Sequence, residues 1–357
     1  MTTIVLAAGG TGGHLYPAEA LAEELLRRGH RVVIVTDKRG NAFQRLSDRV
    51  KIDCVRAATF KPGIFSKIKS IIDIELGLLQ SAALLLKYKP ALIVGFGGYP
   101  SFPTVLAGQI MGLPTIIHEQ NAVLGKANAW LAYAAKKIAV SLPETQGIRP
   151  VDRRKVVFTG NPVRADICAV RDKPYPAPGD IFNIFITGGS QGAKIFSDIV
   201  PEAVRRLPED IKSRLHIVQQ SKESDTAQKY RDAGVRAEVK PFFDDMPERL
   251  SACHLFIGRS GASTVAEIAM VGRPALFVPY PGHADQQQKY NAEQIARKDG
   301  AWVILQEAFT REMLAQQIEH LAKNPGMLEH AAKAASACGQ PEAVMKLADL
   351  VEESLKT

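Results

Sequence analysis

Two glycine-rich loops each stand between an apolar run and a helical pattern, which is an arrangement suited to binding phosphate. The first loop runs from Gly9 to Gly13 and is followed by His14, and the second covers residues 188–193. Small residues let backbone N–H groups approach an anion, and the start of the following helix adds the positive end of its dipole. One such loop has little weight, but two in one chain predict a phosphorylated substrate.

His14 stands directly behind the first loop, where an imidazole can act as a general base or as a charged donor to an anion. The alternative is a histidine that only hydrogen-bonds the backbone at a helix start. A second polar group, residues 118–121, follows another apolar run. Ligands of open α/β sheets bind beyond the carboxyl ends of strands, so we expect this group to line a site.

The second half of the chain has a similar arrangement at residues 258–267, where small residues separate a predicted strand from a predicted helix. Glu267 would stand inside that helix, where a carboxylate can hold a ribose diol. The alternative is an acid near a helix start that is capped by Ser263. Further on, Gln287 and Gln288 offer adjacent amides that suit the hydroxyls of a sugar, although a polar helix start has the same composition.

Several other chemistries fit the residues less well. A dinucleotide-binding fingerprint that starts at Gly10 requires Gly or Ala where Leu15 stands, although Asp37 lies where an acid would meet a ribose. No phosphate-binding P-loop pattern occurs in the chain. No Asp-x-Asp follows a strand and no His/Cys cluster has metal-ligand spacing, so we predict neither a metal nor another cofactor.

The elements that position these residues form two similar sets. Apolar runs at 3–7 and 31–36 flank a helical pattern at 17–28, which predicts a βαβ unit and a parallel sheet. The pattern restarts with an apolar strand at 181–187, and further strands are predicted at 216–219, 254–257, 274–278 and 302–305. We therefore predict an α/β protein of two Rossmann-like domains that face each other across a cleft. The domains are 1–163 and 164–340, followed by a terminal helix over 341–355.

Length and charge agree with two domains and an anionic partner. The chain has 357 residues with 45 Lys and Arg against 37 Asp and Glu, which gives a net charge of +8. Residues 1–163 carry +10 and the remainder carries −2. Nucleic acid, an anionic membrane and a phosphorylated substrate all fit a basic half. Nucleic acid is disfavoured because that half has no aromatic-rich or helix-turn-helix pattern.

The four cysteines lie far apart, so we expect free thiols and no disulfide framework. A charge-free stretch at 90–117 is long enough to suggest a membrane span. Its four prolines and five glycines instead predict a strand, a loop and a short helix. Residues 60–89 combine aliphatic residues at helical spacing with flanking lysines. Such a helix either packs on the sheet with solvated lysines or lies on an anionic bilayer.

Taken in order, these motifs closely resemble the peptidoglycan glycosyltransferases that transfer N-acetylglucosamine from UDP-N-acetylglucosamine to lipid I, which gives lipid II. The resemblance covers essentially the whole chain. It rests on the motifs 9–14, 97–99, 118–121, 160–164, 188–193, 259–262, 267, 285 and 287–288. It implies a GT-B type fold and an inverting, metal-independent hexosyltransferase.

The resemblance also implies roles for particular residues. The second domain would hold the donor, with Glu267 on the ribose and Phe243 at the uracil. Ser190 and the backbone of residues 262–265 would bind the diphosphate, and Gln287 and Gln288 would reach the sugar. The first domain would hold the acceptor pyrophosphate near Thr11, Gly12, Gly13 and His14. The reaction also needs a base for the acceptor hydroxyl, for which we favour His14, with Glu119 as its rival. The residues given a substrate-binding role are Thr11, Gly12, Gly13, Tyr99, Asn121, Arg164, Ser190, Phe243, Ala262, Ser263, Thr264, Val265, Ala266, Glu267, Gln287 and Gln288.

The implied partners are the nucleotide sugar, lipid I and an anionic membrane surface, with no nucleic acid. The expected location is peripheral, at the cytoplasmic face of the bacterial inner membrane, and this favours a bilayer contact for residues 60–89. The expected helix at 341–357 would pack back on the first domain. Two alternatives remain open: a related UDP-sugar transferase with another lipid or small acceptor, and, more remotely, a dinucleotide-dependent oxidoreductase.

Overall fold

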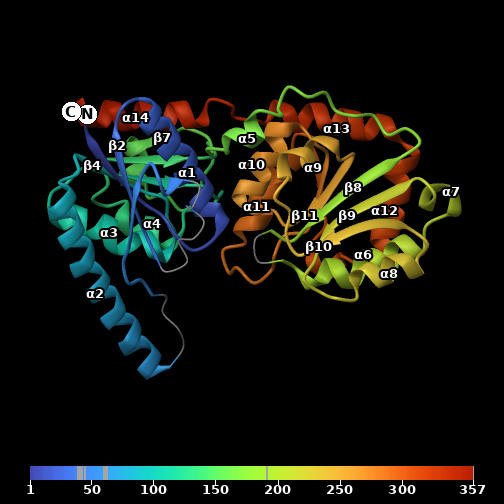
Figure 1. The fold of residues 1–357 in the computed structure, drawn as a ribbon, viewed down its shortest axis with the longest axis horizontal. Coiled ribbons are helices and arrows are strands. Elements are labelled where there is room, and N and C mark those ends of the chain that lie inside the picture. The colour runs from blue at the N-terminus through green and yellow to red at the C-terminus, as the bar shows by residue number, and fades with distance from the viewer. Residues whose placement is uncertain (38–42, 44–45, 59–62, 190–191, 357) are drawn as a thin grey trace. The chain divides into compact units, whose positions relative to one another are not determined.

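The chain forms two compact units, each built on its own parallel sheet (Figure 1). A computed structural model describes residues 1–37, 43, 46–58, 63–189 and 192–356, with only the backbone described at 64–68. Unit 1 comprises Met1–Arg164 and Pro341–Thr357, and unit 2 comprises Ala165–Gln340. The chain therefore leaves unit 1 and returns to it at its end.

Unit 1 contains a seven-stranded sheet in the order β3-β2-β1-β4-β5-β6-β7. The strands are β1 (Thr3–Ala7), β2 (Arg31–Thr36), β3 (Lys51–Cys54), β4 (Leu92–Gly95), β5 (Thr115–Glu119), β6 (Lys137–Val140) and β7 (Val156–Phe158). Its helical elements are α1 (Gly12–Arg27), α2 (Ile64–Tyr88), α3 (Gly98–Ile110), α4 (Lys126–Leu131), η2 (Pro150–Lys155) and α14 (Ala343–Lys356).

Alternation along the central strands builds two cores, one on each face of this sheet. Ile4 and Leu6 of β1 join the core beneath α1 and α14, whereas Val5 and Ala7 join the core that contains residues of α2, α3 and α4. Successive side chains of a strand point to opposite faces, so a continuous apolar run marks a strand that is covered on both sides.

Unit 2 contains a six-stranded parallel sheet in the order β10-β9-β8-β11-β12-β13. The strands are β8 (Phe182–Thr187), β9 (Leu215–Gln220), β10 (Arg236–Lys240), β11 (Leu255–Gly258), β12 (Ala275–Phe277) and β13 (Ala301–Val303). The helical elements are α5 (Ala165–Cys168), α6 (Lys194–Arg205), α7 (Glu209–Lys212), α8 (Thr226–Asp232), α9 (Met246–Ala252), α10 (Ala262–Val271), α11 (Gln287–Ala296), η3 (Gln306–Ala308), α12 (Arg311–Lys323) and α13 (Pro325–Ala337).

The prediction of two Rossmann-like α/β sheets is confirmed, with differences at particular elements. The first helix begins at Gly12 and not at Pro17, because Gly12 and Gly13 adopt helical backbone within the predicted loop. Four strands were not predicted: β3, β6, β7 and β10. The strands β3 and β10 are edge strands with charged and half-exposed residues, so neither shows the apolar run of a buried strand. The strands β6 and β7 have only four and three residues, which is too short for a clear pattern.

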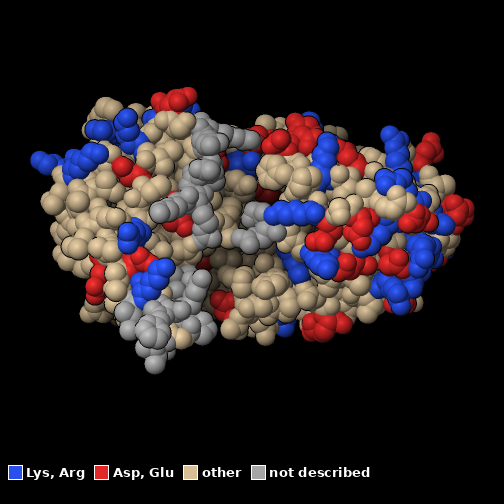
Figure 2. Space-filling view, turned by 60° about the horizontal axis from the view of Figure 1, so that its bottom comes forward, with Lys and Arg blue, Asp and Glu red and all other residues tan. Residues whose placement is uncertain are grey.

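The charge asymmetry of the sequence does not appear as one continuous basic patch on the face shown in Figure 2. Over unit 2, acidic and basic side chains are interspersed, and much of the described surface of unit 1 is uncharged. Interspersed charges of both signs on unit 2 agree with the value of −2 that the sequence gives for residues 164–357.

The last helix, α14, completes the core of unit 1 by packing on α1 (Figure 1). Leu347 and Val351 are fully buried in the core that also holds Leu21. At the rim, the guanidinium of Arg28 donates to Asp349 at 2.6 Å and to Glu352 at 2.8 Å. Apolar packing and ion pairs thus both attach the final helix to unit 1.

We expect Leu347→Ala to destabilise unit 1 selectively, because it opens a cavity in a fully buried core. Such truncations cost about 2–5 kcal/mol. Hydrogen exchange measured by mass spectrometry should show faster exchange in α1 and β1 and unchanged exchange in β8 and β9. Lys346→Ala, at an exposed neighbouring position, is the control. Equal acceleration in both units would contradict the assignment of α14 to unit 1.

Candidate active site

His14 lies in the first turn of α1, at the carboxyl end of the sheet in unit 1. Its Nδ1 is 2.9 Å from the carbonyl oxygen of Phe96 and 3.1 Å from Oε1 of Gln120. Both partners are acceptors, so Nδ1 carries the proton. Among the described residues, Nε2 of His14 has no hydrogen-bond partner. The ring therefore offers an acceptor nitrogen beside the N-terminus of a helix.

The glycines of the neighbouring loops let the chain pass close to this ring. A Cβ on Gly98 would lie 3.1 Å from Cδ2 and 3.2 Å from Nε2 of His14, and Gly98 has a φ of +69°. A Cβ on Gly9 would lie 2.6 Å from Cβ of Pro100. Any side chain at Gly98 would be strained and would press on the imidazole, so this glycine sets the position of His14.

Glu119 ends β5 and is buried, with its carboxylate occupied by four hydrogen bonds. Oε1 accepts from the backbone N–H and the side-chain amide of Asn121, both at 3.0 Å. Oε2 accepts from the backbone N–H of Gly125 and from Nδ2 of Asn128, both at 2.9 Å. The carboxylate thus holds the turn that leads from β5 into α4.

The other predicted residues of unit 1 lie at α1, α3 and the end of the unit. Thr11 is the residue before α1, and Gly12 and Gly13 form its first turn, where N–H groups have no partner within the helix. The hydroxyl of Tyr99 donates to Oδ2 of Asp37 at 3.0 Å. Asp37, weighed above as a ribose ligand, therefore holds α3 against the end of β2. Arg164 stacks over the ring of Tyr16, 4.5 Å from its centroid.

In unit 2 the predicted diphosphate site is the N-terminus of α10, behind β11. Gly261 precedes the helix, so Ala262, Ser263 and Thr264 form its first turn, whereas the N–H of Val265 donates to Gly261. Ala266 follows within the helix. The hydroxyl of Ser263 is buried and has no partner among the described residues. Free N–H groups and an unpaired buried hydroxyl are what an entering phosphate would need.

Glu267 lies one turn further along α10 and is buried, at 8% exposure. The carboxylate of Glu267 thus lies close to the helix start that is predicted to bind the diphosphate. Phe243 is buried among rings, with Phe185 at 5.8 Å and the guanidinium of Arg249 at 5.1 Å from its centroid. Ser190 lies outside the described residues.

The two glutamines predicted to reach the sugar are engaged in holding the loop before α11. Oε1 of Gln288 accepts from the backbone N–H of Tyr280 at 2.9 Å, and Nε2 of Gln287 lies 2.8 Å from Nδ1 of His283. The hydroxyl of Ser260 donates to the carbonyl of Gln288 at 2.8 Å. This loop and the start of α10 are therefore fixed to each other by hydrogen bonds.

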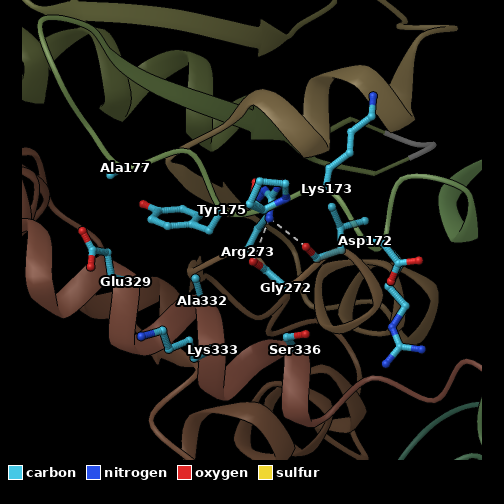
Figure 3. A pocket seen from close by; sticks show the side chains of 13 residues that line it. Asp172, Lys173, Tyr175, Ala177, Gly272, Arg273, Glu329, Ala332, Lys333 and Ser336 are labelled. Atoms are coloured by element: carbon cyan, nitrogen blue, oxygen red, sulfur yellow. Dashed lines mark hydrogen bonds between the residues drawn. The ribbon is translucent and has the colours of Figure 1, made fainter.

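A cavity of about 500 Å³ in unit 2 was not predicted from the sequence (Figure 3). It lies between the connection 171–177, the end of α10 and one face of α13, and no predicted site residue lines it. The buried guanidinium of Arg273 uses its N–H groups on backbone carbonyls and so ties these segments together. Its acceptors are the carbonyls of Pro174, Leu250, Ser251, Val271 and Gly272.

Within the described part of the chain, no group of three or more His, Cys, Asp or Glu side chains could hold a metal ion. No described helix is long and apolar enough to cross a bilayer.

Comparison with known proteins gives consistent results. Residues 4–140 match the N-terminal domain of glycosyltransferase family 28, and residues 183–352 match its C-terminal domain. A protein from Rhodospirillum centenum is 52% identical over 98% of this chain and 94% of its own length. One from Brucella abortus is 45% identical over 98% and 93%. Both are named UDP-N-acetylglucosamine–N-acetylmuramyl-(pentapeptide) pyrophosphoryl-undecaprenol N-acetylglucosamine transferase.

Solved structures agree with these relatives. The crystal structure of MurG from Acinetobacter baumannii matches with a TM-score of 0.78 and 31% identity, covering 99% of this chain and 100% of that one. The calicheamicin glycosyltransferase CalG4 matches with a TM-score of 0.67 and 16% identity, which shows a shared fold alone. The predicted GT-B type fold and the resemblance to peptidoglycan glycosyltransferases are thus confirmed. The chain belongs to glycosyltransferase family 28 and, within it, to the pyrophosphoryl-undecaprenol N-acetylglucosamine transferases.

Proposed function

We propose that this chain transfers N-acetylglucosamine from UDP-N-acetylglucosamine to the 4-hydroxyl of the MurNAc unit of lipid I, with inversion at the anomeric carbon. The relatives that match this chain over almost their whole length are named for this activity. In the structure the proposal is supported by the position of His14. Its imidazole stands in the first turn of a helix, and its Nε2 has no partner among the described residues.

The reaction needs a base for the acceptor and charge stabilisation for the leaving group. Nε2 of His14 takes the proton of the 4-hydroxyl, and the oxygen of that hydroxyl forms the new bond to the anomeric carbon. The bond from that carbon to the phosphate oxygen breaks, and its electron pair leaves with UDP. The N–H groups at the start of α10 and the hydroxyl of Ser263 then stabilise the growing charge on the diphosphate.

His14 fits the role of base better than Glu119 does. Three of the four donors on the Glu119 carboxylate come from the turn that this residue organises, and the fourth is Asn128 of α4. Proton uptake by this carboxylate would weaken these bonds. In our proposal Glu119 is a positioning residue for the segment that carries Asn121. The acceptor pyrophosphate lies against Thr11, Gly12 and Gly13, whose N–H groups begin α1.

We further propose that α2 contacts an anionic membrane surface. Ile72, Leu76, Leu79, Ala83 and Leu86 follow one another at spacings of three and four residues, so they form one exposed stripe on the helix. Leu79 and Leu86 are 68% and 65% exposed. The opposite face of α2 packs on α3.

The charged residues along α2 fit a bilayer that carries negative charge. Lys69, Lys87 and Lys89 are exposed near the two ends of the described helix, and each lysine near an anionic surface contributes about 1 kcal/mol. Two acids, Asp73 and Glu75, lie between them, and Asp73 pairs with Arg56 at 3.4 Å. A peripheral position at a bilayer would bring the chain to a polyprenyl-linked acceptor. Lys61 and the side chain of Lys67 lie outside the described residues.

The proposed function is tested by transfer of labelled N-acetylglucosamine to lipid I in detergent. We expect product with the natural chain, and a fall of roughly 10²–10⁴-fold in kcat/KM for His14→Ala, because a general base typically contributes that much. In Glu119→Gln the amide oxygen still accepts from two of the four donors, so kcat/KM should fall less than in His14→Ala. Failure of the natural chain to form product would disprove the function, and a loss below tenfold in His14→Ala would disprove the base.

Glu267→Gln should raise KM for UDP-N-acetylglucosamine more than it lowers kcat, because the ribose is remote from the reacting carbon. A charge-assisted hydrogen bond contributes about 1.5–3 kcal/mol, so we expect roughly a ten- to hundredfold rise in KM. Steady-state kinetics with varied donor measure it. Glu319→Gln, at a half-exposed acid on α12, is the control. A change confined to kcat would argue against ribose binding.

Leu79→Glu combined with Leu86→Glu should weaken binding to anionic phospholipid vesicles by at least about tenfold, because each buried leucine contributes about 1.5–3 kcal/mol. Vesicle co-sedimentation measures the bound fraction. Ile181→Glu makes the same change at an exposed position of unit 2 and should bind like the natural chain. Activity on a detergent-dispersed acceptor should persist in all variants. Undiminished vesicle binding of the double variant would exclude α2 as the contact.

A further inference from the structure

A continuous chain of hydrogen bonds runs from His14 into the interior of unit 1. Gln120 is 2% exposed and His118 is fully buried. Nε2 of Gln120 lies 2.9 Å from the carbonyl oxygen of Phe96 and 3.0 Å from Nδ1 of His118, while its Oε1 lies 3.1 Å from Nδ1 of His14. The far end of the chain is the carbonyl oxygen of Gly160, 3.2 Å from Nε2 of His118.

The chemistry of the partners gives every bond in this chain one direction. The carbonyl of Gly160 can only accept, so Nε2 of His118 carries the proton and Nδ1 is left as an acceptor. The amide N–H₂ of Gln120 donates to that Nδ1 and to the carbonyl of Phe96. Its carbonyl oxygen is thereby turned toward His14, whose Nδ1–H donates to it. These proton positions follow from the donor and acceptor chemistry of the partners.

The buried histidine is suited to remain neutral in this chain. Burial lowers the pKa of His118 to about 4, so at pH 7 its Nδ1 stays unprotonated and able to accept from Gln120. The hydroxyl of Ser141 lies 3.5 Å from Nε2, on the same side as Gly160. A protonated His118 would present Nδ1–H to the amide N–H₂ and would turn Gln120 away from His14.

We propose that Gln120 and His118 are positioning residues that fix the tautomer of His14. They act through the hydrogen-bonded chain that links His14 to the carbonyl of Gly160. The chain keeps the proton of the neutral His14 ring on Nδ1 and leaves Nε2 as the acceptor nitrogen. The inference rests on the proposed function, because it concerns the base of that reaction.

An amide in this place has a different effect from a carboxylate. When Nε2 takes the proton of the acceptor hydroxyl, the imidazolium keeps Nδ1–H directed at two neutral oxygens, those of Phe96 and Gln120. Neutral acceptors orient the ring without stabilising its charged form as strongly as a carboxylate does. These neighbours therefore orient the imidazole without placing a negative charge beside it.

The tautomer is tested directly with protein carrying ¹⁵N-labelled histidine. Long-range ¹H–¹⁵N spectra at pH 7.5 distinguish the two ring nitrogens, and His14→Gln identifies the signals of His14. We expect a protonated Nδ1 and an unprotonated Nε2 at His14, and the reverse at His118. A proton on Nε2 of His14, or an even mixture of tautomers, would overturn the proposal.

Gln120→Glu tests the effect of charge at the same place. The carboxylate still accepts from Nδ1–H of His14 but also stabilises its imidazolium, so the acid limb of the kcat/KM profile should move upward by about one pH unit or more. The other titratable groups nearby are Glu119, Tyr99, Asp37 and His118. Of these, His118 loses the donor to its Nδ1, so its ¹⁵N spectrum is recorded in the same variant. Gln146→Glu makes the same change at an exposed position of unit 1. Overlapping profiles for the natural chain and Gln120→Glu would overturn the proposal.

Replacement of His118 tests the inner end of the chain. His118→Leu removes the acceptor for Gln120 and should lower kcat about tenfold or more with little change in KM for the nucleotide sugar. His118→Asn places an amide oxygen near the position of Nδ1 and should restore part of kcat and the His14 spectrum. Equal kcat in both variants and in the natural chain would overturn the role of His118.

The spectra separate this inference from the proposed function. If the tautomers are as expected and His14→Ala retains kcat/KM within tenfold, then the chain orients a histidine that is not the base. That result would disprove the proposed mechanism while it supports the hydrogen-bonded chain. If His14→Ala is inactive and the tautomer is mixed, the base stands and the positioning role is overturned.

Discussion

The four hydrogen bonds on the Glu119 carboxylate are the constraint on which the site in unit 1 depends. A carboxylate buried at the end of a central strand must be paired, because an isolated buried charge is costly. Here the pairing groups all come from the six residues that follow and from Asn128 of α4, so satisfying the charge folds the turn. This turn fixes where β5 ends, and it directs Gln120 toward Phe96 and His14.

The two units use helix starts in similar ways but hold their polar side chains differently. In unit 1 the side chains around His14 form a buried chain with defined donors and acceptors. In unit 2 the side chains of Gln287 and Gln288 hold the loop beside α10, and the hydroxyl of Ser263 has no partner among the described residues. Hydrogen bonds hold the amide of Gln120 in one orientation, whereas a buried hydroxyl without a partner gains one when a polar ligand enters.

Much of this architecture could be predicted from local patterns. Apolar runs followed by glycines located β1, β8 and the helix behind each loop, because buried parallel strands and phosphate-binding turns have strong compositional patterns. The start of α1 was placed too late, at Pro17, because Gly12 and Gly13 were assigned to the loop. The edge strands β3 and β10 could not be found this way, since their charged residues face solvent. The contacts of His14 with Phe96 and Gln120 also escaped prediction. They join residues 82 and 106 positions apart, and their directions depend on the geometry of three strand ends.

The return of α14 to unit 1 also has a consequence for biosynthesis. The chain is made from its N-terminus, so the sheet of unit 1 emerges from the ribosome long before the helix that covers Leu21 and its neighbours. Unit 2 lies within the sequence of unit 1 and can fold first, as an insertion with both ends tethered. The domain that begins the chain is thus completed last, and until then its apolar face is open to chaperones or to aggregation.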